Sequence, residues 1–148
     1  SFLRSRIDES GISNVVVAGN SMGGYAALLF GILINANVVH AFSPHTNLKN
    51  PKLIRKKSQL LHVHNNYSRK YFDVKKVIKS HRGSGVFNVY FDSGNDKDNK
   101  HAMHIKRMRN VTLHPFDRGN HNVVRVLRDS GELRDIIISS LNDVPSKE

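Results

Sequence analysis

A serine at position 21 stands where its hydroxyl could act as a nucleophile. Residues 19–23 read Gly-Asn-Ser-Met-Gly and fit the pattern G-x-S-x-G. An apolar, β-branched run, Val15 to Ala18, precedes this pattern, and an apolar segment with helical spacing, Tyr25 to Phe30, follows it. A sharp turn from strand to helix presents the serine at the helix N-terminus, where the backbone N–H of Met22 can donate to a developing oxyanion. The pattern predicts Ser21 as a nucleophile and Met22 as an oxyanion donor.

Two simpler explanations would also account for these residues. The serine could merely cap the helix, or the glycines could form a phosphate-binding loop. The second is disfavoured, because no Gly-Lys-Ser/Thr follows and G-x-G-x-x-G is absent. Strand and helix can pass closely in such a turn only if small residues stand two before and two after the serine, and Gly19 and Gly23 fit this requirement. The flanking strand and helix favour a nucleophile over a cap.

Alternating strand and helix patterns predict an α/β fold, with a parallel sheet and flanking helices. Strands are expected over residues 15–18, 38–42, 86–91 and 111–116, and helices over 1–9, 25–35, 71–78, 99–108, 123–127 and 133–141. The carboxyl ends of parallel strands meet at one rim of the sheet. His45 and Thr46, just after the second strand, are therefore expected near Ser21 as substrate contacts, together with Asn20.

His121 and three aspartates are candidates for the base and the acid that a nucleophilic serine requires. His121 lies in a glycine-containing loop after the fourth predicted strand, and Asp92, Asp96 and Asp98 lie in the loop after the third. Both loops should open on the rim that carries Ser21. The residues alone leave all three aspartates open as candidates for the acid.

The sequence resembles serine hydrolases of the α/β-hydrolase fold, and over a longer stretch an esterase-like bacterial group. The similarity rests on GNSMGGYAALLFG at the turn and on DNKHA, NVTLHPF and GNHNVVRVLRDSGEL in the second half, while residues 48–84 match least. In this fold the catalytic residues follow the order serine, acid, histidine, which the sequence keeps. The resemblance also implies earlier strands, whose loop supplies a second oxyanion donor. We therefore expect a version of the fold truncated or reduced at its N-terminus, with an upstream region as a candidate partner.

The resemblance also favours Asp98 as the acid. In hydrolases of this fold the acid follows its strand by several residues, which implies that Asp92, adjoining Phe91, is too early to bend back toward the histidine. The similar group has an aspartate three residues before a His-Ala pair, and Asp98 precedes His101-Ala102 by that spacing. A competing role for Asp98 is the N-cap of a helix that begins at Asn99. Asp96 stays open as the alternative acid.

Length and composition are typical of one domain covering residues 1–148. The chain is 39% hydrophobic and 24% charged, as in ordinary globular domains. It has no cysteine, which excludes disulfides and thiolate metal sites and favours a cytoplasmic location. No apolar run approaches the roughly 20 residues that a membrane span needs. Residues 48–84 have weak periodicity and are interpreted as a helical insertion or lid.

Positive charge is concentrated in the middle of the chain. Residues 49–109 hold 16 lysines and arginines against 4 aspartates, and the net charge of the whole chain is +11. If this region forms a pocket wall, it would attract an anionic substrate; the simpler explanation is a solvated charged face. Nucleic acid is a disfavoured partner, because no stacking or groove-reading motif accompanies the charge.

Histidine pairs raise the question of a metal site. His62 and His64 would point to one side of a strand, and His101 and His104 would share a helix face. Neither pair belongs to a zinc signature such as H-E-x-x-H. No metal and no other cofactor is therefore predicted.

Two functions from different classes remain. The first is a serine hydrolase or acyltransferase that acts on an ester or thioester, either a small molecule or linked to a saccharide, through a Ser-His-Asp triad and an acyl-enzyme. The second is a non-catalytic module that binds an anionic polymer or a partner through the basic middle third. The order serine, acid, histidine favours the first function, whereas the basic charge and the missing oxyanion loop favour the second.

Overall fold

Four parallel strands form a single sheet in the order β1-β2-β3-β4. The structure, a computed structural model, describes residues 2–50, 52, 68–80 and 83–142. The strands are β1 (Val16–Asn20), β2 (Val38–Phe42), β3 (Val86–Asp92) and β4 (Val111–Phe116). The register places Asn20 beside Phe42, and Phe42 beside Tyr90. The predicted parallel α/β architecture is confirmed.

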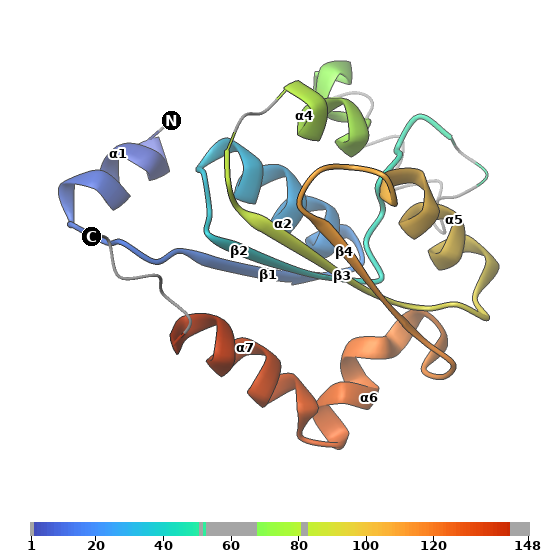
Figure 1. The fold of residues 1–148 in the computed structure, drawn as a ribbon. Coiled ribbons are helices and arrows are strands. Elements are labelled where there is room, and N and C mark those ends of the chain that lie inside the picture. Colours follow the sequence, from blue (N-terminus) through green and yellow to red (C-terminus); the bar gives the residue numbers. More distant parts are fainter. Residues whose placement is uncertain (1, 51, 53–67, 81–82, 143–148) are drawn as a thin grey trace.

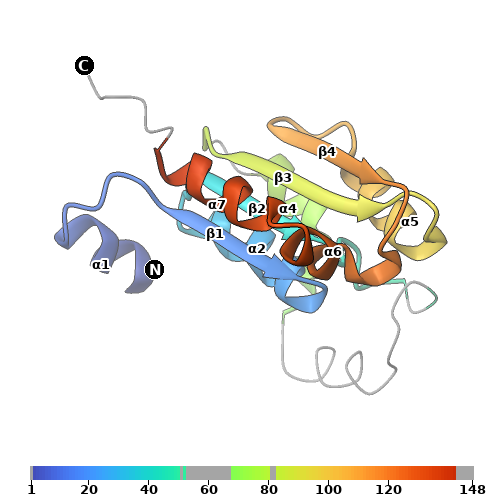
Figure 2. The same ribbon diagram turned by 90° about the horizontal axis from the view of Figure 1, so that it is seen from below.

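Different helices cover the two faces of the sheet (Figure 1). The helical elements are α1 (Phe2–Glu9), α2 (Met22–Leu33), η2 (Arg69–Tyr71), α4 (Val74–Ser80), α5 (Asp96–Ile105), η3 (Asn120–Asn122), α6 (Val123–Asp129) and α7 (Glu132–Asn142). Helices α2, α4 and α5 lie on one face, and α6 and α7 cross the other face (Figure 2). Among the described helices, none is long and apolar enough to cross a membrane.

The core is divided between these two faces because successive side chains of a strand point to opposite sides. On the α2 side, Val39 and Ala41 of β2 are fully buried and belong to one cluster with Leu28 of α2. On the α6 side, Phe42 packs in a second cluster with Val123. The sheet therefore holds α2 and α6 at fixed positions on its two sides, and both helices lie next to the carboxyl ends of the strands.

A buried polar cluster connects the sheet to α7. His40 Nδ1 lies 3.1 Å from the Tyr90 hydroxyl, and His40 Nε2 lies 2.7 Å from Ser140 Oγ. Tyr90 also stacks on His114, with ring centroids 4.5 Å apart. Burial lowers the pKa of His40, which the nearby His114 lowers further, and burial also lowers the pKa of His114. Burial raises the pKa of Tyr90 to about 12.

Helix α5 begins three residues earlier than the sequence pattern predicts. The side chain of Asn95 is the N-cap, since its Oδ1 accepts hydrogen bonds from the backbone N–H groups of Lys97 at 3.1 Å and Asp98 at 3.0 Å. The competing role of Asp98, as the N-cap of a helix starting at Asn99, is therefore contradicted. Asp98 lies inside the first turn of α5, where its side chain is free to point toward another element.

The predicted insertion at residues 48–84 falls partly outside the described residues. Within the described part, Val74, Val77 and Ile78 of α4 belong to the core cluster that also contains Leu28. Helix α4, which follows β2 and precedes β3 along the chain, therefore packs into the core of the domain. Residues 53–67 lie outside the described residues, and a lid there stays a prediction.

Candidate active site

Ser21 sits in a strained backbone conformation at the junction of β1 and α2. Its φ of 57° and ψ of −116° are values that a residue with a side chain rarely adopts. Neighbouring backbone groups hold it in place: the Ser21 N–H donates to the Phe42 carbonyl at 2.8 Å, and the Tyr25 N–H donates to the Ser21 carbonyl at 3.0 Å. The turn fixes the position of the Ser21 hydroxyl at the N-terminus of α2.

The glycines around Ser21 have different roles. A Cβ on Gly19 would lie 2.1 Å from the Gly23 carbonyl oxygen, so only glycine fits at position 19. A Cβ on Gly24 would lie 3.0 Å from Pro44 Cβ. A Cβ on Gly23 would meet nothing within 4 Å in the described structure. The expectation that both Gly19 and Gly23 must be small is therefore confirmed at Gly19 and wrong at Gly23, because the close contact at position 23 is made by its backbone.

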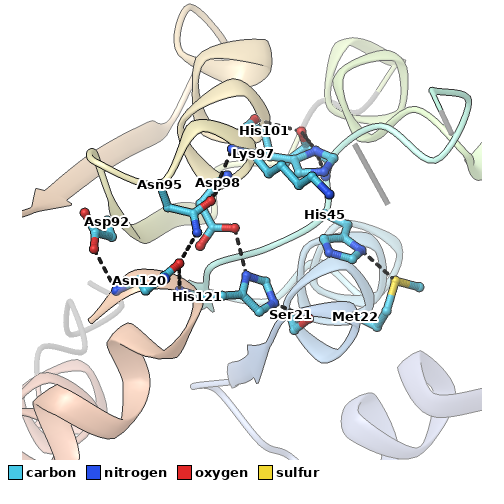
Figure 3. A network of polar contacts seen from close by, with 11 residues as sticks. Ser21, Met22, His45, Asp92, Asn95, Lys97, Asp98, His101, Asn120 and His121 are labelled. Atoms are coloured by element: carbon cyan, nitrogen blue, oxygen red, sulfur yellow. Dashed lines mark hydrogen bonds and ion pairs between the residues drawn. The ribbon is translucent and has the colours of Figure 1, made fainter. Parts of the chain in front are cut away.

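Three side chains from different elements form a chain of hydrogen bonds (Figure 3). Ser21 Oγ lies 2.8 Å from His121 Nε2, and His121 Nδ1 lies 2.8 Å from Asp98 Oδ1. His121 comes from η3, after β4, and Asp98 from the first turn of α5, after β3. Both are largely buried, with 9% and 3% of their surface exposed. The structure thus brings together Ser21, His121 and Asp98.

The order of these contacts sets the direction of the hydrogen bonds. A carboxylate can only accept, so the proton of a neutral His121 lies on Nδ1 and is donated to Asp98. Nε2 is then left with a free lone pair, which accepts the hydrogen bond from the Ser21 hydroxyl. This arrangement can take a proton from Ser21 when its oxygen attacks an electrophile. The N–H of Met22, at the start of α2, is among the donors that a helix leaves without an intrahelical partner.

The other two candidate acids lie elsewhere. Asp96 is exposed and pairs with Lys100 of the next turn at 2.6 Å. Asp92 is buried, and its two oxygens accept backbone hydrogen bonds from Gly94 at 2.8 Å and from Asn120 at 2.6 Å. Asp92 therefore ties the loop that precedes α5 to the loop that carries His121.

Two asparagines that sequence reasoning missed strengthen this connection. The Asn95 Nδ2 group donates to Asn120 Oδ1, which also accepts the His121 N–H at 2.9 Å. Because Asn95 also accepts the Asp98 N–H as the cap of α5, its side chain connects the backbone of Asp98 to Asn120, the residue before His121. An asparagine before a helix is a recognisable capping signal, but the contact with Asn120 joins residues 25 apart in the chain and has no local signature.

Of the predicted rim contacts, His45 lines the site and Thr46 does not. His45 borders a cavity next to His121, and its Nδ1 lies 3.0 Å from Met22 Sδ. Thr46 is completely buried: its N–H donates to His101 Nδ1 at 3.1 Å, and its hydroxyl donates to the His101 carbonyl at 2.7 Å. The expectation that Thr46 contacts substrate is therefore wrong, because its polar groups hold the loop after β2 against α5.

Asn20 is also displaced from the polar side of the site. It is exposed and borders a separate apolar groove of about 250 Å³, together with Phe42, Val124 and Leu133. This groove lies between the end of β1 and helices α6 and α7. The structure does not bring Asn20 together with His45 in one cavity.

The described residues contain no group of three or more side chains that could hold a metal ion. Of the histidines considered for zinc, His101 accepts a hydrogen bond from Thr46, and His104 Nε2 lies 2.8 Å from Asp73 Oδ1. His62 and His64 lie outside the described residues.

No protein-family model and no curated protein sequence matches this chain. Solved structures do match it. A capsule O-acetyltransferase of Neisseria meningitidis serogroup A is 19% identical with a TM-score of 0.68, over 92% of this chain and 61% of that protein. An S-formylglutathione hydrolase from Agrobacterium tumefaciens is 16% identical with a TM-score of 0.62, over 98% and 56%. An alpha-beta hydrolase from Vibrio vulnificus is 18% identical with a TM-score of 0.60, over 93% and 53%. The chain thus spans between 53% and 61% of the lengths of these proteins.

Proposed function

We propose that this chain, which has the α/β-hydrolase fold, carries the catalytic triad of a serine hydrolase or acyltransferase. Ser21 is the nucleophile, His121 the general base and acid, and Asp98 the residue that orients His121. The observation that carries this proposal is the chain of contacts from Ser21 Oγ through His121 to Asp98, with both distances at 2.8 Å. The strained backbone at Ser21 supports it, because such strain is typical of active sites.

The reaction proceeds in two halves. Ser21 Oγ attacks the carbonyl carbon of an ester or thioester while its proton passes to His121 Nε2, and the Met22 N–H stabilises the oxyanion. The carbon–oxygen or carbon–sulfur bond then breaks, and His121 returns the proton to the departing alcohol or thiol. Water, or a second alcohol in a transferase, then attacks the carbonyl carbon of the acyl-enzyme while its proton passes to His121. The bond from that carbon to Ser21 Oγ breaks, His121 returns the proton to Ser21, and the acid or the new ester leaves.

The names of two similar proteins support esters and thioesters as the substrate class. One is named an S-formylglutathione hydrolase and another an O-acetyltransferase. The first name describes cleavage of a thioester and the second transfer of an acetyl group to oxygen. Both reactions fit a nucleophilic Ser21, so the substrate class we propose is a small molecule or a saccharide-linked compound that carries an ester or thioester. No comparable observation favours a non-catalytic module.

Covalent labelling tests this function. A fluorophosphonate probe should modify Ser21 of the wild-type protein, and peptide mapping should locate the adduct. Ser21→Ala should abolish the labelling, whereas Ser139→Ala, at an exposed position on α7, should leave it intact. A wild-type protein that is folded but unlabelled, or a Ser21→Ala variant that is still labelled, would contradict the proposal.

A further inference from the structure

A cavity of about 290 Å³ adjoins the His121–Asp98 pair. Besides that pair and His45, its walls are Asn95, Lys97, Asn120 and Asn122. Each of these described wall residues has a polar side chain, and none is aliphatic. Such a cavity leaves a hydrocarbon chain without apolar contacts, whereas it offers hydrogen bonds to hydroxyl, carboxylate or phosphate oxygens.

The position of the cavity indicates which portion of the substrate it would bind, the acyl group or the leaving alcohol or thiol. In the proposed reaction the leaving oxygen or sulfur must come within hydrogen-bond distance of His121 in order to receive its proton. The group bound to that atom then extends past His121. Because the cavity is bordered by His121 and His45, it lies where the alcohol or thiol portion of the substrate would be held.

Lys97 is the cation in this wall. Its side chain is exposed and extends from α5 toward His45 (Figure 3). Lys100, one turn later, pairs with Asp96 at 2.6 Å, whereas Lys97 forms no ion pair among the described residues. Asp98 contacts His121 through Oδ1, and Asp92 accepts two backbone N–H groups, so neither carboxylate is paired with Lys97. The positive charge of Lys97 is therefore available to a ligand.

We infer that this cavity selects substrates whose alcohol or thiol portion carries an anionic group, a carboxylate or a phosphate, and that Lys97 pairs with it. This inference rests on the proposed function and adds a specificity-determining residue to it. The asparagine amides can donate to the remaining anionic oxygens or to hydroxyl groups. A charge-assisted hydrogen bond to an anion is stronger than a neutral one, so Lys97 discriminates between charged and neutral substrates of the same shape.

Matched acetyl esters test the inference in the folded protein. The esters are para-acetoxybenzoate and para-acetoxyphenyl phosphate, which are anionic, and methyl para-acetoxybenzoate, which is neutral. Lys97→Gln should lower the ratio of kcat/KM for each anionic ester to that for the neutral ester by about tenfold, through KM. Lys97→Arg should keep most of the preference. Lys100→Gln, which removes the same charge from the same helix, is the control and should leave the ratio unchanged.

A binding measurement separates this inference from the proposed function. In the Ser21→Ala protein, which cannot turn over, the Kd of para-hydroxybenzoate or para-hydroxyphenyl phosphate should rise about tenfold when Lys97→Gln is added. The inference is overturned for an anion if its Kd is the same with and without Lys97→Gln. It is also overturned if Lys100→Gln raises that Kd as much as Lys97→Gln does. Failure of wild-type Ser21 to react with the fluorophosphonate probe would instead count against the proposed function.

Discussion

The carboxylate of Asp98 binds His121 through one oxygen and is buried without a partner at the other. Oδ1 lies 2.8 Å from His121 Nδ1, whereas Oδ2 has no hydrogen-bond partner among the described residues. Buried polar atoms usually have partners, and one that lacks them destabilises the fold. The unpaired Oδ2 therefore indicates that the Asp98 carboxylate is positioned to bind His121, although its burial costs stability.

The first prediction concerns this pair. In Asp98→Asn the amide can donate to His121 Nδ1, which places the histidine proton on Nε2 and removes the acceptor for Ser21. We expect kcat for an acetyl ester to fall by about ten-thousand-fold with little change in KM. Asp96→Asn, which changes an exposed carboxylate two residues earlier, is the control and should retain kcat within about twofold. If Asp96→Asn has the large effect, Asp98 is not the acid.

The second prediction concerns the bridge from Asn95 to Asn120. Asn95→Ser keeps a side-chain oxygen that can cap α5 but removes the amide that donates to Asn120. We expect kcat to fall about tenfold, because His121 is less well positioned, with stability changed by less than about 0.5 kcal/mol. Asn95→Ala should lose the cap as well and about 1 kcal/mol of stability. Equal kcat values for the wild type and Asn95→Ser, measured alongside urea denaturation, would show that the bridge does not position His121.

The third prediction contrasts two glycines of the turn. Gly19→Ala would force a methyl group against the Gly23 carbonyl, 2.1 Å away, and should destabilise the protein by about 3 kcal/mol or prevent folding. Gly23→Ala has open space at its Cβ and lies in α2, where alanine is favoured over glycine. It should be neutral or stabilise by up to about 1 kcal/mol. Chemical denaturation measures both, and a greater loss at position 23 would contradict this description of the turn.

The fourth prediction concerns acid stability. His40 and His114 have lowered pKa values in the folded protein, so unfolded chains bind protons at these sites more readily than folded ones. The stability that the neutral rings contribute is fully present above the unfolded pKa of about 6.5 and is lost as pH falls through the folded values. The free energy of unfolding should therefore decrease between pH 7 and pH 5. His40→Gln, which keeps a polar side chain that does not titrate, should show a smaller decrease; an unchanged slope would exclude His40 as a cause.

Local sequence was sufficient for much of the fold. The sequence pattern predicts strands over residues 86–91 and 111–116, and both ranges lie within β3 and β4. The serine between a β-branched run and an apolar helix was enough to locate the turn at Ser21, because hydrophobic spacing and close glycine packing are properties of neighbouring residues. The same reasoning identified His121 and a short set of aspartates as candidates, since parallel strands present their carboxyl ends at one rim.

Tertiary structure decided which candidates meet. Asp98 reaches His121 because Asn95 starts α5 early and α5 packs against β3, while Asp96, two residues away, points to solvent. Thr46 is adjacent to His45 in the sequence, yet the packing of α5 buries it against His101. The contact between Asn95 and Asn120, and the position of Lys97 in the same cavity wall as His121, likewise depend on how α5 and η3 are placed relative to each other. These contacts join residues 23 to 100 positions apart, and their geometry depends on how helices pack on the sheet, which hydrophobic periodicity does not specify.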